Sequence, residues 1–336
     1  KRQYWIIGLF ISLLFFGSVL AHELGHALLA LRNEVPVKSI SLFLFGGVAQ
    51  ITREPRTPGS EFRIAIAGPL VSLALGLFFG LVYLLSQNVA VIAAPALWLA
   101  RINIILALFN RIPGFPLDGG HVLRAVVWQI TGQEFRSTRI ASVAGQVVAY
   151  SFVGFGILRL FGGNPVNGLW LAFIGFFLRN AASSSYQYAD MQEALQGVSA
   201  ADVMSRDLTR IPGYMPLSSL TDPQPIAQGT RAFFVSDENE IRGMLTLTDV
   251  AGIPENHRPL TTADQVMVPE YLLTSVDPDT ELFNALSSME ENNIKQVPVI
   301  ENGNILGLLS RDQVFQYLRR KTELDFLTRR VSPSSA

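Results

Sequence analysis

The chain has 336 residues, of which 49% are hydrophobic and only 16% are charged, and its formal net charge is −1. The hydrophobic residues are concentrated before about residue 182, and the remainder has the composition of an ordinary soluble domain. The chain has no cysteine, which excludes disulfides, thiol catalysis and cysteine-based metal sites. No long basic run offers nucleic acid an electrostatic footprint, so we expect no nucleic-acid partner.

Stretches of 18 or more largely apolar residues are long enough to cross a bilayer, and the sequence contains roughly five of them. The second stretch contains Gly68-Pro69, a kink that neighbouring helices can tolerate, and the fourth is rich in small residues suited to close helix packing. We therefore expect a multi-pass α-helical membrane domain over residues 1–182. The spans are expected at about residues 4–31, 62–86, 89–112, 139–160 and 166–181.

Two of the four histidines lie in the sequence His22-Glu23-Leu24-Gly25-His26, near the end of the first expected span. Residues four apart lie on one face of a helix, so both imidazoles can point toward one metal ion. The neighbouring Glu23 can then take a proton from an attacking water molecule, as in zinc peptidases. These three polar side chains are costly to bury in a bilayer unless they coordinate something. The alternative is a loop or helix end where both histidines are merely solvated.

The segment between the first two spans is too short and too interrupted to be another span. Residues 39–45 alternate in the manner of a β-strand, and Gly46-Gly47 follows as a turn signal. Backbone polar groups at membrane depth must be paired, so we expect a small β hairpin or edge strand against the protein core. Such an edge could hold a substrate as an added strand. A surface hairpin with no substrate role is the alternative.

Positively charged residues indicate the orientation of the spans, because they are enriched in short cytosolic loops. The His-Glu motif, the connection around Asp118 and the C-terminal domain are all expected on the cytosolic side, with the cell membrane as the host membrane. The residues that indicate this lie after the first span and between the third and fourth: Arg32, Lys38, Arg53, Arg56, Arg63, Arg136 and Arg139.

A second group of polar residues lies at positions 110–120, where the third expected span ends. Two prolines, Pro113 and Pro116, bar a continuous helix, so the backbone must unwind there. Asp118 would then lie on irregular backbone at membrane depth, where an isolated carboxylate is costly unless it is paired or bound to a metal. As a third ligand it would complete a set of two histidines and one carboxylate, leaving a fourth position for water. The alternative is that Asp118 caps the helix expected over residues 121–130.

The His22–His26 motif on one membrane helix, with Leu117-Asp118-Gly119 on a later one, resembles the site-2 protease family. More closely, the chain resembles the prokaryotic subgroup fused to a pair of cystathionine-β-synthase (CBS) domains, and the resemblance covers nearly all of it. The resemblance implies an intramembrane zinc metalloprotease that cuts membrane-spanning proteins in or near the lipid bilayer. It implies that His22, His26 and Asp118 hold one Zn²⁺ and that Glu23 is the general base. It also implies that Asn110 donates to the substrate carbonyl or fixes the loop.

Two features depart from that family. Its core usually has one more span before the helix with the His-Glu motif. Either a further span lies upstream of Lys1 or the active-site cleft lacks one wall. His121 stands where close relatives are expected to have arginine. It lies three residues after Asp118, so it could be an alternative ligand, and the other interpretations are a hydrogen-bonding partner of a ligand or a surface histidine.

The C-terminal part contains an internal repeat over residues 199–322, after a polar linker at 183–198 and before a tail at 323–336. Ala201-Asp202-Val203-Met204 returns as Ala263-Asp264-Gln265-Val266-Met267. Likewise, Gly243-Met244-Leu245-Thr246 is matched by Gly307-Leu308-Leu309-Ser310. The halves, at about 199–253 and 261–320, each read as strand, helix, strand, strand, helix, which predicts an α/β domain.

This repeat resembles a tandem CBS pair, which implies a regulatory unit that often binds adenine nucleotides such as ATP or AMP and often forms dimers. Thr246 and Asp249 fit the family's phosphate and ribose contacts. In the second repeat Ser310 is followed three residues later by Gln313, so only one site keeps the acid that the family uses. A pair that binds no nucleotide and serves only for dimerisation is the alternative.

Two other functions remain open at this point. The chain could be a channel or transporter regulated by its CBS pair, or a catalytically silent scaffold that binds nucleotide. A transporter would be expected to have repeated membrane halves with paired broken helices, and the sequence has no such repeat. We expect Glu23→Gln to abolish proteolysis and to leave transport or scaffolding intact.

Overall fold

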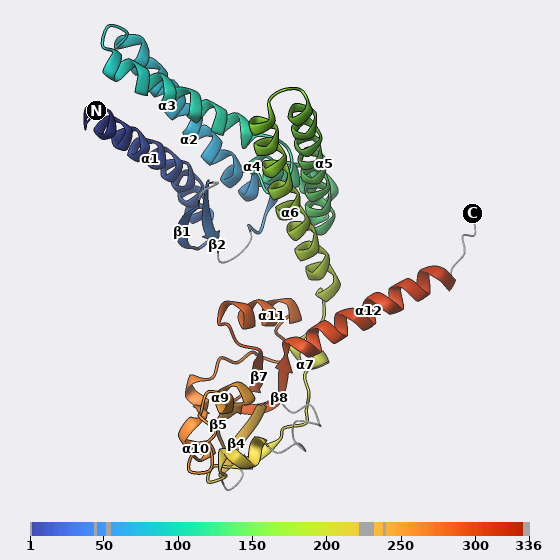
Figure 1. The fold of residues 1–336 in the computed structure, drawn as a ribbon. Coiled ribbons are helices and arrows are strands. Elements are labelled where there is room, and N and C mark those ends of the chain that lie inside the picture. Colours follow the sequence, from blue (N-terminus) through green and yellow to red (C-terminus); the bar gives the residue numbers. More distant parts are fainter. Residues whose placement is uncertain (1, 44–45, 52–54, 222–231, 238–239, 332–336) are drawn as a thin grey trace. The chain divides into compact units, whose positions relative to one another are not determined.

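The computed structural model describes residues 2–43, 46–51, 55–221, 232–237 and 240–331, and the chain divides into two compact units, Lys1–Asp190 and Met191–Ala336 (Figure 1). The first unit is helical apart from one hairpin. Its elements are α1 (Arg2–Arg32), β1 (Val37–Phe43), β2 (Gly46–Ile51), α2 (Pro58–Leu85), α3 (Ala90–Phe109), α4 (Asp118–Thr131), α5 (Glu134–Phe161) and most of α6 (Pro165–Leu195).

Among the described residues, four helices are long and apolar enough to cross a membrane, namely α1 from Ile7, α2, α3 and α5. The expected fifth span lies in α6, which is 31 residues long but does not join that group. Arg179, Asn180 and the serines at 183–185 make its second half polar, so four of the roughly five expected spans are confirmed among the described residues. The segment expected as a linker from residue 183 is helical as far as Leu195.

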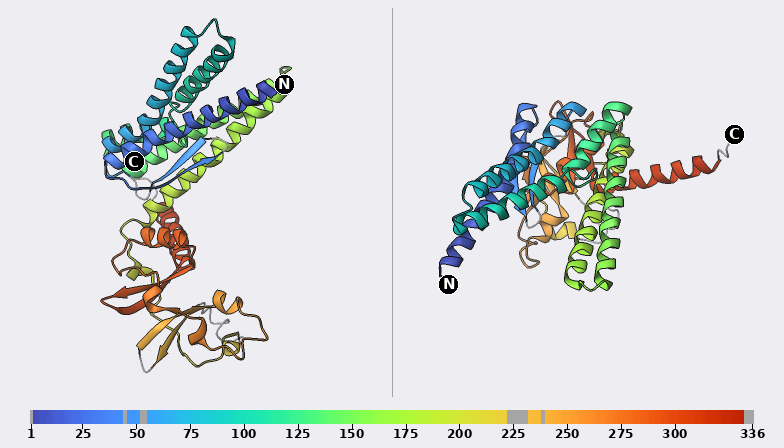
Figure 2. Two further views of the ribbon diagram at one scale, coloured as in Figure 1. Left: turned by 90° about the vertical axis from the view of Figure 1, so that its left-hand side faces the viewer. Right: turned by 90° about the horizontal axis from the view of Figure 1, so that it is seen from above.

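Helix α2 lies between α1, α3 and α4 and is therefore the central element of the first unit. Its start is well specified, because Thr57 accepts a hydrogen bond from the backbone N–H of Ser60 and Pro58 occupies the first turn. Pro69 lies inside the helix without ending it. A short connection then joins α2 to α3, and the two run side by side as a hairpin (Figures 1 and 2).

Helices α5 and α6 pack closely through small residues, as the sequence predicts for the fourth span. A Cβ atom added at Gly156 would lie 2.6 Å from the backbone nitrogen of Ala172 and 2.8 Å from the carbonyl oxygen of Gly168. Glycine at this crossing therefore lets the two backbones approach each other.

The predicted hairpin is present, with β1 and β2 paired antiparallel. Gly46 and Gly47, expected as a turn, belong to β2, where they pair with Phe43 and Leu42. The positions between the two strands, residues 44–45, fall outside the described residues.

The second unit contains a four-stranded sheet in the order β3-β4-β5-β6 and a two-stranded sheet, β7-β8. The strand predicted at Val297–Ile300 is buried within β7. The helix expected between the first two strands of the first half falls between β3 and β4, where residues 222–231 are outside the described part. The elements are α7 (Ala200–Val203), β3 (Arg210–Pro212), η1 (Leu217–Thr221), β4 (Ala232–Asp237), β5 (Glu240–Thr246), α9 (Leu247–Ala251), α10 (Ala263–Val266), β6 (Val268–Pro269), η2 (Glu270–Leu272), α11 (Leu282–Glu291), β7 (Gln296–Glu301), β8 (Asn304–Ser310) and α12 (Arg311–Val331).

The two repeats of this unit are joined by reciprocal pairing. Ser205, just after α7 of the first repeat, exchanges two backbone hydrogen bonds of 2.9 Å with Leu308 in β8 of the second. Conversely, Val268 in β6, just after α10 of the second repeat, pairs with Met244 in β5 of the first. Each repeat therefore completes its sheet edge with a segment of the other.

The repeated glycines lie where these segments cross. A Cβ atom at Gly307 would lie 2.7 Å from the carbonyl oxygen of Ser205 and 2.6 Å from Sδ of Met204. A Cβ atom at Gly243 would overlap the carbonyl oxygen of Val268 in the same way. The methionine of each repeat therefore packs against the glycine of the other repeat, Met204 against Gly307 and Met267 against Gly243. This shared contact accounts for the Met and Gly positions that recur in the sequence.

Candidate metal centre

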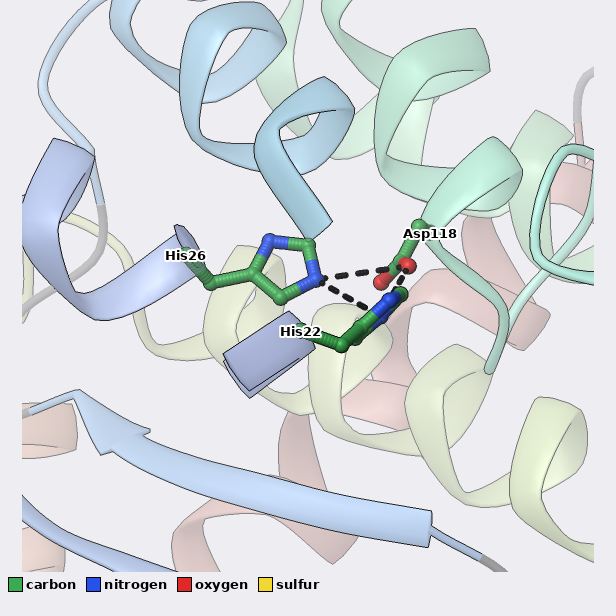
Figure 3. Close-up of side chains that lie close together, drawn as sticks. All are labelled: His22, His26 and Asp118. Atoms are coloured by element: carbon green, nitrogen blue, oxygen red, sulfur yellow. Dashed lines mark hydrogen bonds and ion pairs between the residues drawn. The ribbon is translucent and has the colours of Figure 1, made fainter. Parts of the chain in front are cut away.

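Three side chains from two helices meet in the first unit (Figure 3). His22 and His26 lie one turn apart on α1, and Asp118 is the first residue of α4. The two Nε2 atoms are 3.2 Å apart, and Oδ2 of Asp118 lies 3.2 Å from one and 3.3 Å from the other. Both histidines are buried, with exposed fractions of 3% and 9%.

These separations suit a zinc ion. Zinc binds histidine nitrogen and carboxylate oxygen at about 2.0–2.1 Å in tetrahedral geometry, which places neighbouring ligand atoms about 3.3 Å apart. The three donor atoms therefore define one face of such a tetrahedron, with the fourth corner left for another ligand. The donor set of two imidazoles and one carboxylate is also a common catalytic one.

The orientation of both rings is fixed from α2. Nδ1 of His26 is 2.7 Å from the carbonyl oxygen of Ile64, which can only accept, so the proton of this ring is on Nδ1. Nδ1 of His22 is 2.8 Å from Oγ of Ser72. Nε2 of His26 then presents its lone pair to the centre, and the same arrangement follows for His22 when the Ser72 hydroxyl accepts the proton of Nδ1.

Gly68 makes room for the two rings. A Cβ atom there would overlap Nε2 of His26 and lie 2.6 Å from Nε2 of His22. In the sequence, Gly68 indicates only a kink together with Pro69, and no motif marks Ser72. A signal was present, because Ile64, Gly68 and Ser72 follow one another at four-residue spacing on one face of a helix.

Asp118 does not cap α4, so that alternative is wrong. The N-cap residue is Leu117, which makes no side-chain cap, and Asp118 follows it inside the first turn with its carboxylate toward the histidines. The predicted unwinding between α3 and α4 is present. Gly119 donates a 2.6 Å hydrogen bond to the carbonyl oxygen of Asn110, and an added Cβ there would overlap the carbonyl of Ile112.

The connection before Asp118 is also held from α5. The backbone N–H of Phe115 donates a 3.1 Å hydrogen bond to the carbonyl oxygen of Ala141. Gly145, one turn further along α5, faces the backbone of Phe115 so closely that a Cβ atom would overlap its carbonyl oxygen. The carboxylate of Asp118 thus follows a loop that is packed against α5.

The other predicted active-site residues surround the centre. Asn110 follows α3, and its Nδ2 lies 3.4 Å from Nε2 of His22. Glu23 is buried on α1 between the two histidines in sequence, with 8% of its surface exposed. Among the described residues it is not a member of the three-donor group.

His121 faces a different cluster. Its Nδ1 lies 3.2 Å from Oε1 of Glu61, and its ring packs against Phe115. The same Glu61 oxygen is 3.2 Å from Arg124, which also binds Glu134 at 2.7 Å. This buried cluster joins α2, α4 and α5 and was missed by the sequence analysis, because its members are spread over 74 positions without a recognisable motif.

In the second unit, a cavity of about 720 Å³ lies between the two repeats. Thr246 and Asp249 line it from the first repeat, and Lys295, Ser310 and Arg311 from the second. Oδ2 of Asp249 also accepts hydrogen bonds from the backbone N–H and the hydroxyl of Thr246, at 2.8 and 2.6 Å. Asp249 therefore already closes a capping box at the start of α9.

The second repeat repeats this local arrangement with an amide. Oε1 of Gln313 accepts hydrogen bonds from the backbone N–H and the hydroxyl of Ser310, at 2.7 and 3.0 Å. The two sites are thus alike in local structure and differ in charge.

The fold and the centre define a class: a multi-pass membrane protein with a helical core, a histidine–aspartate centre and a C-terminal CBS pair. Residues 10–95 and 86–155 match peptidase family M50, and residues 263–320 match the CBS domain. The relative sll0528 of Synechocystis sp., named as a zinc metalloprotease, is 35% identical over 94% of this chain and 84% of its own length. Rip3 of Mycobacterium tuberculosis, also named as a zinc metalloprotease, is 33% identical over 93% of this chain and 80% of its own.

The chain belongs to peptidase family M50, the site-2 protease family. Among solved structures, the site-2 protease from Methanocaldococcus jannaschii is 32% identical, with a TM-score of 0.41, and the match covers 55% of this chain and 79% of that one.

Proposed function

We propose that the chain is an intramembrane zinc endopeptidase that hydrolyses peptide bonds of membrane-spanning proteins. The observation that carries the proposal is the triangle of donor atoms at 3.2–3.3 Å from His22, His26 and Asp118. In this proposal these three residues hold one Zn²⁺. When bound, zinc supplies Lewis acidity, because it polarises the scissile carbonyl and lowers the pKa of water.

The remaining residues handle the proton and the substrate. Glu23, next to the first ligand, accepts a proton from the attacking water molecule and passes it to the leaving amine. Asn110, whose amide already points to Nε2 of His22, donates to the substrate carbonyl or keeps the loop in place. The substrate must unwind locally, and we propose that it does so by pairing with the β1–β2 hairpin.

The experiment compares the wild-type chain with Glu23→Gln in lipid vesicles that contain a single-span reporter. We expect the variant to retain zinc and to lose proteolysis, because it removes the proton acceptor and none of the ligands. Cleavage at the wild-type rate by the zinc-containing variant would contradict the assigned role of Glu23. A variant that keeps transport activity would instead favour the channel or transporter hypothesis.

We also propose that the CBS pair binds an adenine nucleotide such as ATP or AMP and thereby regulates proteolysis. The cavity between the repeats supports this, because it offers the Asp249 carboxylate together with the cations Lys295 and Arg311. A nucleotide can gate proteolysis only through different affinities for two arrangements of the chain. The proposal places this pair in the cytoplasm, the helices in the cell membrane, and a homodimer contact on the CBS unit.

A further inference from the structure

Arg101 lies near the middle of α3, one of the helices that can cross a membrane. A helix of 20 residues is about 30 Å long, the thickness of the hydrocarbon layer, so a membrane-crossing α3 places the backbone of Arg101 away from both surfaces. Its side chain is exposed rather than packed inside the unit. Among the residues that the structure describes, none forms an ion pair or hydrogen bond with it. A charge at this depth is costly unless something pairs with it.

Arg101 lines an apolar groove of about 640 Å³ between α2 and α3. Leu77, Leu81 and Leu84 line it from α2, and Ile105 lines it from α3. All four are exposed large hydrophobic residues. Gly80 has no side chain and leaves open space in the groove, because a Cβ atom there would meet nothing within 4 Å. The groove extends over about two turns of α2, which suits the face of a crossing helix.

A second copy of this chain does not fit the groove. In the four membrane-capable helices, the acidic residues are Glu23, Glu61 and Glu134. Glu23 is buried beside the metal centre, whereas Glu61 and Glu134 lie in the first turns of α2 and α5, near a membrane surface. None of these is available to pair with a cation in the middle of the bilayer. Lipid phosphates also lie at the surface and not at this depth.

We propose that the α2–α3 groove docks a transmembrane helix of another protein that carries an aspartate or glutamate near its midpoint. The carboxylate pairs with Arg101, and the helix lies over Gly80 between the exposed leucines. This inference does not rest on the proposed proteolysis, because it concerns the face of α2 and α3 away from the donor triangle. On α2, Gly80 is 12 residues from Gly68, which is about 18 Å along the helix.

The test uses the full chain in phosphatidylcholine vesicles with labelled single-span peptides of leucine and alanine. The peptides carry either glutamate or glutamine at the central position, and association is measured by energy transfer. We expect the glutamate peptide to bind the wild-type chain about tenfold more tightly than the glutamine peptide. Arg101→Leu should remove this preference. Arg101→Glu should transfer it to a peptide with a central lysine.

A steric variant tests the groove separately from the charge. Gly80→Leu places a large side chain in the groove from a position where the Cβ atom meets nothing within 4 Å, and it should block binding of the glutamate peptide. Gly154→Leu is the matched control, because this glycine of α5 also has nothing within 4 Å of an added Cβ. Zinc content should be unchanged in all these variants. Equal binding of the glutamate and glutamine peptides, or full binding by Gly80→Leu, would overturn the proposal. Enrichment of spin-labelled anionic lipid at Arg101 without a peptide preference would assign the cation to lipid and overturn it too.

Discussion

At the scale of single residues, the candidate centre depends on residues that are not among its three donors. Ile64 and Ser72 orient the two imidazoles, and Gly68 leaves the space into which both rings project. Partners of this kind commonly affect metal affinity by about 10–100-fold. The four-residue spacing on α2 is therefore as much a part of the site as the four-residue spacing on α1.

The first prediction concerns Gly68→Ala. The added methyl group would overlap the ring of His26, so we expect zinc content to fall well below one ion per chain and proteolysis to be lost. Gly80→Ala is the control on the same helix, because its methyl group would meet nothing within 4 Å. Metal analysis of both purified variants checks the prediction. Full zinc content in Gly68→Ala would show that α2 does not pass as close to the rings as described.

At the scale of elements, α4 is fixed to its neighbours by buried charges. Arg124 binds Glu61 on α2 and Glu134 on α5, and both Arg124 and Glu61 are almost fully buried. The first turn of α4 carries Asp118, so this cluster also positions the carboxylate that we propose as a metal ligand. Removing one partner of a buried ion pair leaves an uncompensated charge.

For Arg124→Met we expect a loss of about 3–5 kcal/mol in the free energy of unfolding, because the buried Glu61 carboxylate loses the guanidinium that lies 3.2 Å from its Oε1 atom. Thermal unfolding in detergent measures this. The double variant Glu61→Gln with Arg124→Met should recover part of the loss, since no unpaired charge then remains at that position. A double variant less stable than the single one would contradict this explanation.

The sequence predicts the elements with regular patterns well and the tertiary contacts poorly. Apolar runs indicate four membrane helices correctly, and the prolines before Asp118 correctly indicate an unwound connection. The spacing of His22 and His26 predicts their common face, and the unwound backbone before Asp118 indicates this carboxylate as their partner. The polar second half of α6 reads as a linker in the sequence, because composition alone does not distinguish an exposed helix from a loop. Ser72 and Arg124 were missed because their partners are distant in sequence.

At the scale of the whole molecule, the chain combines a membrane unit with a duplicated α/β unit. The duplicated unit is not two independent domains, because each repeat completes its sheet with a segment of the other. Its cavity is lined by both repeats, so a ligand there would contact both at once. The sequence similarity of the two halves predicts the repeat. Only the structure shows that each repeat pairs a segment with the edge strand of the other.

The charge difference between the repeats gives a prediction for nucleotide binding. We expect Asp249→Ala to weaken binding of ATP or AMP by about ten- to a hundredfold, because a charged hydrogen-bond acceptor is lost. Gln313→Ala is the matched control, since it breaks the equivalent capping box without removing a carboxylate. Equilibrium binding of a fluorescent nucleotide checks both variants. Equal weakening by the two variants would indicate that the capping boxes matter only for folding.

The most direct test of the whole account compares the purified wild-type chain with Asp118→Ala. It measures the metal content of each and the X-ray absorption spectrum at the zinc edge. We predict one zinc ion per wild-type chain, with two nitrogen ligands from imidazole and at least one oxygen ligand, and substantial loss of zinc and of reporter cleavage in the variant. A wild-type chain without stoichiometric zinc would contradict the account. So would an Asp118→Ala variant that binds zinc with unchanged affinity and an unchanged spectrum.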